Sequence, residues 1–137
     1  MNNTMQELEH FINHWADSSE QNKKAFVSLK DYLVSQTGVI LDFVSRPGVT
    51  HSLRASHKDQ KEESLFILVD VIEDQPRWLS VCFYSHMITD ADEKGVFIPQ
   101  GISGDDAVCF DVETYDKDFI KYLESRIDEA HQNAAEK

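Results

Sequence analysis

The chain has 137 residues, a usual size for one domain, and its 41% hydrophobic content excludes a disordered protein. Its 25 acidic and 13 basic side chains give a net charge of −12, and a field of this sign repels phosphate backbones and anionic membranes. The composition therefore predicts a single globular domain over residues 1–137, with neither a nucleic-acid nor a membrane partner.

Two amphipathic helices are predicted at the start of the chain. Their apolar residues recur at the spacing of one helix face, first at Leu8, Phe11, Ile12 and Trp15, then at Ala25, Phe26, Leu29, Tyr32 and Leu33. The second helix should end near Gln36, because Gly38 suits the left-handed position that follows a helix. Residues 1–3 should fray, and since the N-terminus lacks the pattern of a signal peptide, we expect a cytoplasmic protein.

Extended segments follow the two helices. Apolar or alternating runs predict strands at 39–44, 50–58, 64–72, 77–84 and 107–113. The segment 86–104 is rich in Asp, Gly and Pro and is predicted to be a long loop. A last helix should run from Tyr115 to about Ala134, with 132–137 frayed. This order predicts an α+β two-layer domain, in which two N-terminal helices and a C-terminal helix cover one face of a four- to five-stranded, mainly antiparallel sheet.

The fourth predicted strand carries apolar residues on both of its faces. Leu79, Val81 and Phe83 alternate with a second set that includes Trp78 and Tyr84. A sheet that is apolar on both faces in so small a domain favours a second subunit on the uncovered face. We therefore expect the protein to form a homodimer.

Both cysteines, Cys82 and Cys109, fall inside predicted strands. They lack the Cys-x-x-Cys spacing of metal and redox sites, and disulfides are rare in a reducing cytoplasm. The sequence therefore predicts two buried thiols.

A basic segment interrupts this acidic chain at 50–58. It contains His51, Arg54 and His57, and the aromatic Trp78 of a later strand could complete a pocket beside it. Arginine offers a two-pronged fork of N–H donors to a carboxylate or phosphate. The leading prediction is a non-enzymatic module that binds a small anion or a protein partner through these four residues.

The alternative prediction is an enzyme. A strand histidine, His51 or His57, paired with a carboxylate such as Asp70 or Asp106 would form a general acid–base pair. The chain has no Gly-x-Ser-x-Gly elbow, and neither cysteine lies in a nucleophile motif, so sequence motifs do not support a serine hydrolase or a cysteine protease. Whether the protein is an enzyme stays open at this stage.

The histidines do not predict a metal site. His10 and His14 have the four-residue spacing of zinc ligands on a helix, but the glutamate of the His-Glu-x-x-His motif is missing. His51 and His57 share a strand face, yet six residues of strand separate them by about 20 Å, which is too far to share one ion.

The acidic segment Asp90–Gly95 resembles the first half of an EF-hand calcium loop. Position five of that loop is Lys94 and position twelve is Gly101, where a bidentate glutamate is needed, so an acidic turn is expected instead. The turn at 101–106 lacks the Gly-Lys-Ser/Thr of a phosphate-binding loop. The sequence therefore predicts no metal and no cofactor.

Overall fold

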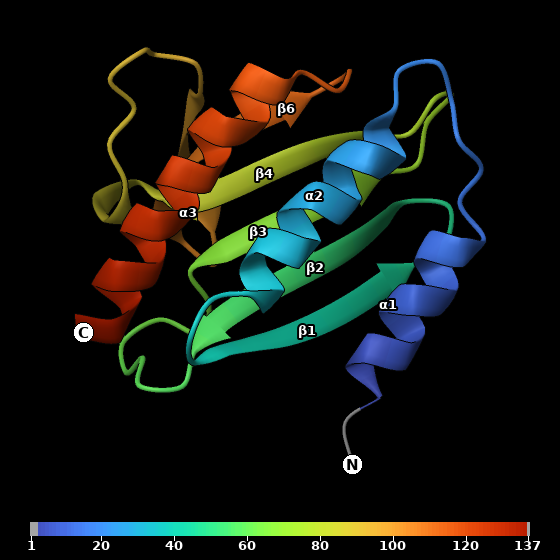
Figure 1. Cartoon of the computed structure of the whole chain (residues 1–137). Helices are drawn as coiled ribbons and strands as arrows, with labels where there is room; N and C mark the ends of the chain where they lie inside the picture. The colour runs from blue at the N-terminus through green and yellow to red at the C-terminus, as the bar shows by residue number, and fades with distance from the viewer. Residues whose placement is uncertain (1–2, 137) are drawn as a thin grey trace.

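The computed structural model describes residues 3–136 and confirms an α+β domain with two N-terminal helices and a C-terminal helix (Figure 1). The elements in chain order are α1 (Thr4–Asn13), α2 (Asn22–Val34), β1 (Val39–Arg46), β2 (Thr50–His57), β3 (Ile67–Ile72), β4 (Trp78–Tyr84), the 3₁₀ helix η1 (Ser85–Met87), β5 (Val96–Ile102), β6 (Asp105–Val112) and α3 (Lys117–Glu136). None of the helices in these residues combines the length and the apolar character that a membrane span requires.

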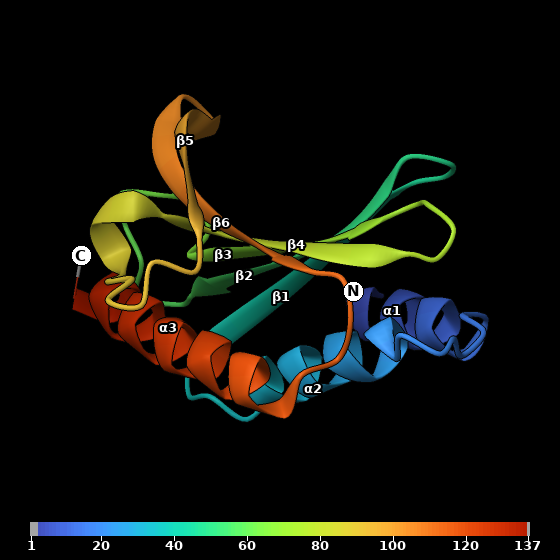
Figure 2. The ribbon, with the colours of Figure 1, turned by 90° about the horizontal axis from the view of Figure 1, so that it is seen from above.

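All six strands form one antiparallel sheet in the order β1-β2-β3-β4-β6-β5. Figure 2 shows the three helices on one face of this sheet and β5 bending up on the other side, which no helix covers and which we call the open face. The core lies between the two layers, where Leu53, Val69, Val81 and Phe110 are completely buried beneath the helices. The two-layer arrangement follows from the strand alternation, because every second strand residue turns toward the apolar faces of the helices.

The predicted long loop at 86–104 is wrong over half of its length, because it contains η1 and the strand β5. Pro99 and Gly101 made this segment look irregular, but proline is tolerated at the edge of a sheet, where no partner needs its missing N–H. Gly101 is needed there, since a Cβ at this position would lie 2.9 Å from the side chain of Ile98. The sheet therefore has six strands instead of four to five.

The C-terminal helix continues beyond the point where fraying was predicted. Residues 132–136 are helical, Ala134 is completely buried, and the Asn133 side chain donates a 2.7 Å hydrogen bond to the carbonyl of Met87. Burial and this bond fix the last turn against η1. The fraying predicted for residues 1, 2 and 137 lies outside the described residues.

The cysteine prediction is also corrected. Cys82 of β4 and Cys109 of β6 are directly opposite each other in the sheet, with Cα atoms 4.1 Å apart, and their sulfurs form a disulfide. Their pairing depends on β6 lying beside β4, a long-range contact that the sequence pattern did not reveal. The disulfide lies on the open face, since Val81 and Phe83 on either side of Cys82 point into the core.

The open face is less apolar than its strand pattern suggested. Trp78 and Tyr84 do lie on it, but so do Asp42, Arg54 and Asp70 of the neighbouring strands. The homodimer was expected because of an apolar second face, and this mixed surface weakens that argument. The homodimer stays a prediction.

Candidate ligand-binding cleft

The four residues predicted to bind a ligand do not gather at one place. His51 and His57 lie on the helix-covered face of β2 near its two ends, whereas Arg54 and Trp78 lie on the open face. Arg54 is opposite Leu68 of β3, and Trp78 is opposite Ile72 of the same strand. Four strand residues, or about 13 Å, therefore separate Arg54 from Trp78 along the sheet.

His57 closes one end of the domain. Its Nδ1 accepts a 3.0 Å hydrogen bond from the backbone N–H of Asp59, and its ring packs against that of His131 on α3, with centroids 5.0 Å apart. The side chain is buried, and Gly38 leaves the space that its ring occupies. These contacts give His57 a structural role.

Arg54 and Trp78 on the open face already have acidic or polar neighbours. Arg54 donates a 3.2 Å hydrogen bond to Ser52 and lies opposite Asp42 in the sheet, which disfavours an anion there. The indole N–H of Trp78 donates to Asp74 at 3.3 Å. Neither residue therefore offers a good anion site, whereas His51 lines a cleft.

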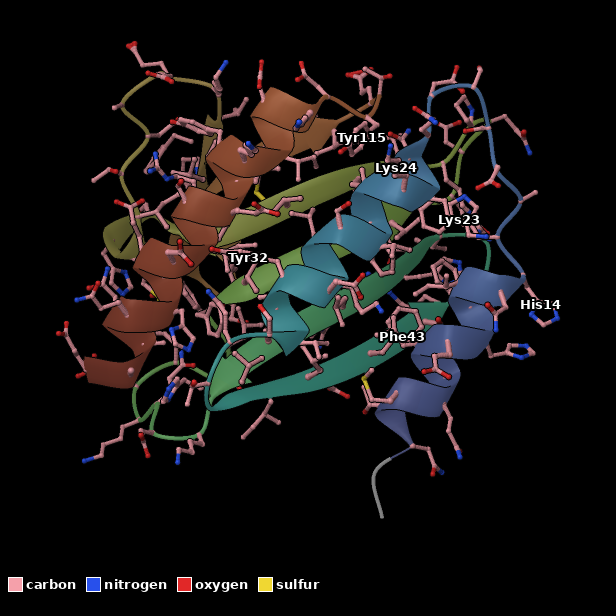
Figure 3. The ribbon with its side chains drawn as sticks, in the orientation of Figure 1. His14, Lys23, Lys24, Tyr32, Phe43 and Tyr115 are labelled. Carbon is pink, nitrogen blue, oxygen red and sulfur yellow. A yellow bond between two sulfur atoms is a disulfide. The ribbon has the colours of Figure 1, made fainter. Side chains whose placement is uncertain are left out.

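His51 opens into a cleft of about 480 Å³ between α1, the β1–β2 hairpin and Arg77, which precedes β4; we call it the α1 cleft. It is lined by Gln6, Glu7, His10, Phe11, His14, Phe43, Ser45, Pro47, His51 and Arg77. Figure 3 shows Phe43 between β1 and α1, and His14 at the far end of the helix, directed outward. This volume lies within the range of small-molecule sites.

Aromatic rings form the floor of the α1 cleft. The Phe11 ring lies 4.5 Å from the His51 ring and 5.3 Å from that of Phe43, measured between centroids. The helix periodicity that predicts α1 turns Phe11 toward the sheet, and the strand alternation turns Phe43 and His51 toward the helix. The local sequence of each element thus explains why these three rings meet.

A chain of polar contacts runs behind this floor. The Ser45 hydroxyl and His51 Nδ1 are 2.9 Å apart, and His51 Nε2 lies 3.4 Å from Oε2 of Glu73. Arg77 holds Glu73 by two hydrogen bonds, one from Nε to Oε1 and one of 3.1 Å to Oε2. The Arg77 guanidinium also lies 4.9 Å from the Phe11 ring centre, so it joins the chain to α1.

The charge of Glu73 determines where the His51 proton lies. Hydrogen bonding from Arg77 lowers the pKa of Glu73 below 4.5, although burial opposes this shift. An ionised carboxylate only accepts hydrogen bonds, so Glu73 favours the neutral tautomer of His51 that has its proton on Nε2, although the 3.4 Å approach is not a hydrogen bond in this structure. In that tautomer Nδ1 is an acceptor, and the Ser45 hydroxyl 2.9 Å away donates a hydrogen bond to it. His51 is only 7% exposed, and the Nδ1 lone pair is its chemically available side.

The α1 cleft also concentrates cationic and N–H-bearing groups. Three of the six histidines of the chain, His10, His14 and His51, line it together with Arg77. Glu7 is the acidic residue of this lining. In a protein of net charge −12, this cleft brings three imidazole rings and one guanidinium together beside one lining carboxylate, Glu7.

Sequence reasoning named His51 as a candidate but missed the groups that contact it in the structure. The carboxylate beside it is Glu73, whereas Asp70 lies on the open face between Ser52 and Ser80, and Asp106 accepts the backbone N–H of Gln100. Asp70 and Asp106 are therefore not the partners that the acid–base hypothesis named. For Ser45, the signal lay in Pro47 and Gly48, because a short hairpin turn at 47–49 places position 45 opposite 51.

The calcium-like segment forms an acidic turn. The two carboxylate oxygens of Asp90 accept the backbone N–H groups of Lys94 and Gly95, at 3.1 and 2.9 Å, and Asp90 also accepts the hydroxyl of Tyr122. Within residues 3–136, no cluster of three or more His, Cys, Asp or Glu side chains is arranged to hold a metal ion.

No protein family model, curated protein or solved structure matches this chain.

Proposed function

We propose that the protein is a binding module whose α1 cleft takes a small carboxylic acid with an aromatic or aliphatic body. The observation that carries this proposal is the pairing of an aromatic floor, Phe11 and Phe43, with the guanidinium of Arg77 in one cleft of about 480 Å³. An apolar body gains free energy from burial against the rings, and its carboxylate gains it from N–H donors.

Arg77 has donors left for a ligand. A guanidinium carries five N–H groups, and two of its nitrogens are bonded to Glu73. The same bonds fix the orientation of the guanidinium, so a ligand would meet a donor that has already lost its rotamer freedom. His10 and His14, which lie on the exposed side of α1, add positive charge when protonated.

The basic segment of β2 contributes to this site through His51. Arg54 lies on the other face and serves as a control position, since it is also an arginine in the sheet. A protein partner remains the other outcome of the hypothesis, in which an acidic side chain of that partner occupies the α1 cleft.

Calorimetric titration with benzoate tests the proposal, with benzyl alcohol as the uncharged ligand of similar shape. We expect benzoate to bind at least tenfold more tightly than benzyl alcohol, since a charge-assisted hydrogen bond is worth roughly 1.5–3 kcal/mol. Arg77→Met should abolish this difference and Arg54→Met should preserve it. Equal binding of the two ligands to the native protein, or an equal loss in both variants, would refute the α1 cleft as a carboxylate site.

A second candidate function is acid–base catalysis. The observation that favours it is the Ser45–His51–Glu73 chain, in which a carboxylate orients a histidine whose free nitrogen faces a hydroxyl.

A further inference from the structure

We propose that Ser45 is a nucleophile and that the protein hydrolyses esters of small apolar carboxylic acids in the α1 cleft. The inference rests on the proposed function, because the acid released by such a reaction is the ligand proposed for the same cleft. It adds a reaction and assigns a role to three residues: Ser45 as nucleophile, His51 as general base and Glu73 as the positioning residue.

The geometry of the three residues supports these roles. A serine hydroxyl becomes nucleophilic when a base within hydrogen-bond reach accepts its proton and a third group orients that base. The Ser45 hydroxyl lies 2.9 Å from His51 Nδ1, and Glu73 lies 3.4 Å from Nε2 on the other side of the ring. The Phe11 ring, tilted by 36° with its centroid 4.5 Å from that of the imidazole, restricts the movement of His51.

Of the three residues, Ser45 is the one that is accessible from the cleft. Ser45 is exposed and lines the α1 cleft, His51 is buried behind it, and Glu73 is half-buried beyond His51. An ester in the cleft would therefore meet the hydroxyl first, while the base stays shielded from solvent. Ser45 achieves this exposure on an edge strand, one residue before its end at Arg46, without the strand-to-helix elbow that the sequence lacks.

The reaction balances in two steps. In the first step Ser45 Oγ bonds to the ester carbonyl carbon, its proton passes to His51 Nδ1, and the carbon–alkoxide bond breaks as His51 returns the proton to the leaving alcohol. In the second step water attacks the acyl-serine, its proton passes to His51, and Ser45 leaves with that proton as the free hydroxyl. The products are one alcohol and one carboxylic acid, and no redox change occurs.

Charged groups of the surrounding elements complete the site. Glu73 and Arg77 come from the β3–β4 hairpin, Glu7 and His10 come from α1, and His14 is the C-cap residue that follows α1. The negative charge that develops on the carbonyl oxygen needs N–H donors, and Arg77 and His10 offer these within the same cleft. Ionised Glu73 favours the imidazolium that forms when His51 takes the proton.

A fluorophosphonate probe, which phosphonylates activated serines, tests the nucleophile. We expect one label per chain, located on Ser45 by peptide mass spectrometry, and a stoichiometric burst of nitrophenol from p-nitrophenyl benzoate. Ser45→Ala should lose both signals, and the matched strand variant Ser56→Ala, which faces the open side, should keep both. No label on the native protein, or equal labelling of Ser45→Ala, would overturn the proposal.

A pH profile tests the roles of His51 and Glu73, and a binding measurement separates ligand binding from acyl transfer. The labelling rate should fall when acid protonates His51. Glu73→Gln should lower it at least tenfold at a temperature where the variant is fully folded, while its circular dichroism spectrum stays native and its Tm falls by only a few degrees. A rate independent of pH and of Glu73→Gln would overturn the assigned roles. If benzoate binds while Ser45 takes no label, acyl transfer is refuted and binding stands; if Ser45 is labelled but benzoate does not bind, the binding proposal fails instead.

Discussion

His51 and Glu73 face each other at the helix-covered end of the sheet, with Nε2 and Oε2 3.4 Å apart. Glu73 belongs to the β3–β4 hairpin, and its second partner, Arg77, lies over the aromatic ring of Phe11 on α1. One network of contacts therefore ties β2, the hairpin and the first helix together. The geometry of the α1 cleft depends on this network, so its stability and its binding should respond to the same substitutions.

The first prediction concerns acid stability. The folded-state pKa of Glu73 lies below 4.5, chiefly because Arg77 donates hydrogen bonds to it. A lowered carboxyl pKa contributes stability that is present above the unfolded-state value and is lost as the pH falls through the folded-state value. Glu73→Gln should therefore lower the free energy of unfolding by about 1 kcal/mol at neutral pH, a modest loss because the side chain is partly exposed. In strong acid the loss should be almost nothing, because Glu73 of the native protein is then protonated.

Urea unfolding at pH 7 and at a pH well below 4.5 measures this difference. Glu62→Gln is a suitable control, because Glu62 is exposed in the connection between β2 and β3. An equal cost of Glu73→Gln at both pH values would show that the charge of Glu73 does not stabilise the network.

The second prediction concerns alkaline stability. The Tyr32 hydroxyl donates to both carboxylate oxygens of Asp128, at 2.7 and 2.8 Å, and joins α2 to α3. Figure 3 shows Tyr32 on the side of α2 that faces α3. Burial, followed by this hydrogen bond, raises the pKa of Tyr32 from 10.0 to about 12. A raised pKa stabilises the fold below the unfolded-state value, and this contribution is lost as the pH rises from 10.0 toward 12.

Tyr32→Phe should remove that contribution. We expect a loss of about 1 kcal/mol at neutral pH and a shallower decline of stability between pH 10.0 and 12 than in the native protein. Thermal unfolding followed across this pH range provides the measurement. Parallel curves for the two proteins would contradict the pKa assignment. Tyr115→Phe is the control that tests whether any tyrosine has the same effect, since the Tyr115 ring lies 4.4 Å from the Lys24 ammonium.

Local patterns in the sequence predicted the elements that a single segment of the chain specifies without its neighbours in the fold. The helix faces of Leu8 and Phe26 and the alternation of Leu79 and Val81 are properties of one segment, and the structure confirms them. Strand β5 was missed because Pro99 and Gly101 are penalised in a central strand but tolerated at an edge, and only the strand order shows which strand is the edge.

The candidate site was less predictable because it depends on register. Ser45, His51 and Glu73 meet only when two hairpins pair correctly, and Arg77 reaches them from the far side of a turn. The same holds for the disulfide, whose cysteines become neighbours through the pairing of β4 with β6. The apolar pattern of one strand shows which face of the sheet a residue is on, but not which residue of the neighbouring strand lies opposite it.

The third prediction concerns this disulfide. It closes a loop of 27 residues, and the loss of loop entropy in the unfolded chain corresponds to about 3.5 kcal/mol. The double variant Cys82→Ala, Cys109→Ala should therefore have a Tm lower by roughly 10 °C under oxidising conditions. Reductant should lower the Tm of the native protein toward that of the variant and leave the variant unchanged. Alkylation of the native protein at both cysteines without reductant would show that the disulfide does not form.

The fourth prediction compares two glycines with nearly equal backbone angles. Gly38 has φ +77° and Gly48 has φ +80°, so alanine at either site is forced into the left-handed region at a cost of roughly 1–2 kcal/mol. A Cβ at Gly38 would also lie 2.7 Å from His57 Nε2, whereas a Cβ at Gly48 meets no atom within 4 Å. Because His57 is buried against His131, its ring has little room to move away.

Gly38→Ala should therefore destabilise the protein by about 1–3 kcal/mol more than Gly48→Ala, which is the range for overpacking a filled site. Urea unfolding of the two variants measures the difference directly, and Gly48→Ala supplies the backbone cost by itself. The His57 proton signals should shift in Gly38→Ala alone, since the added methyl group displaces the imidazole. Equal costs for the two variants would mean that the His57 ring is not fixed against Gly38, and the structural role assigned to His57 would then be wrong.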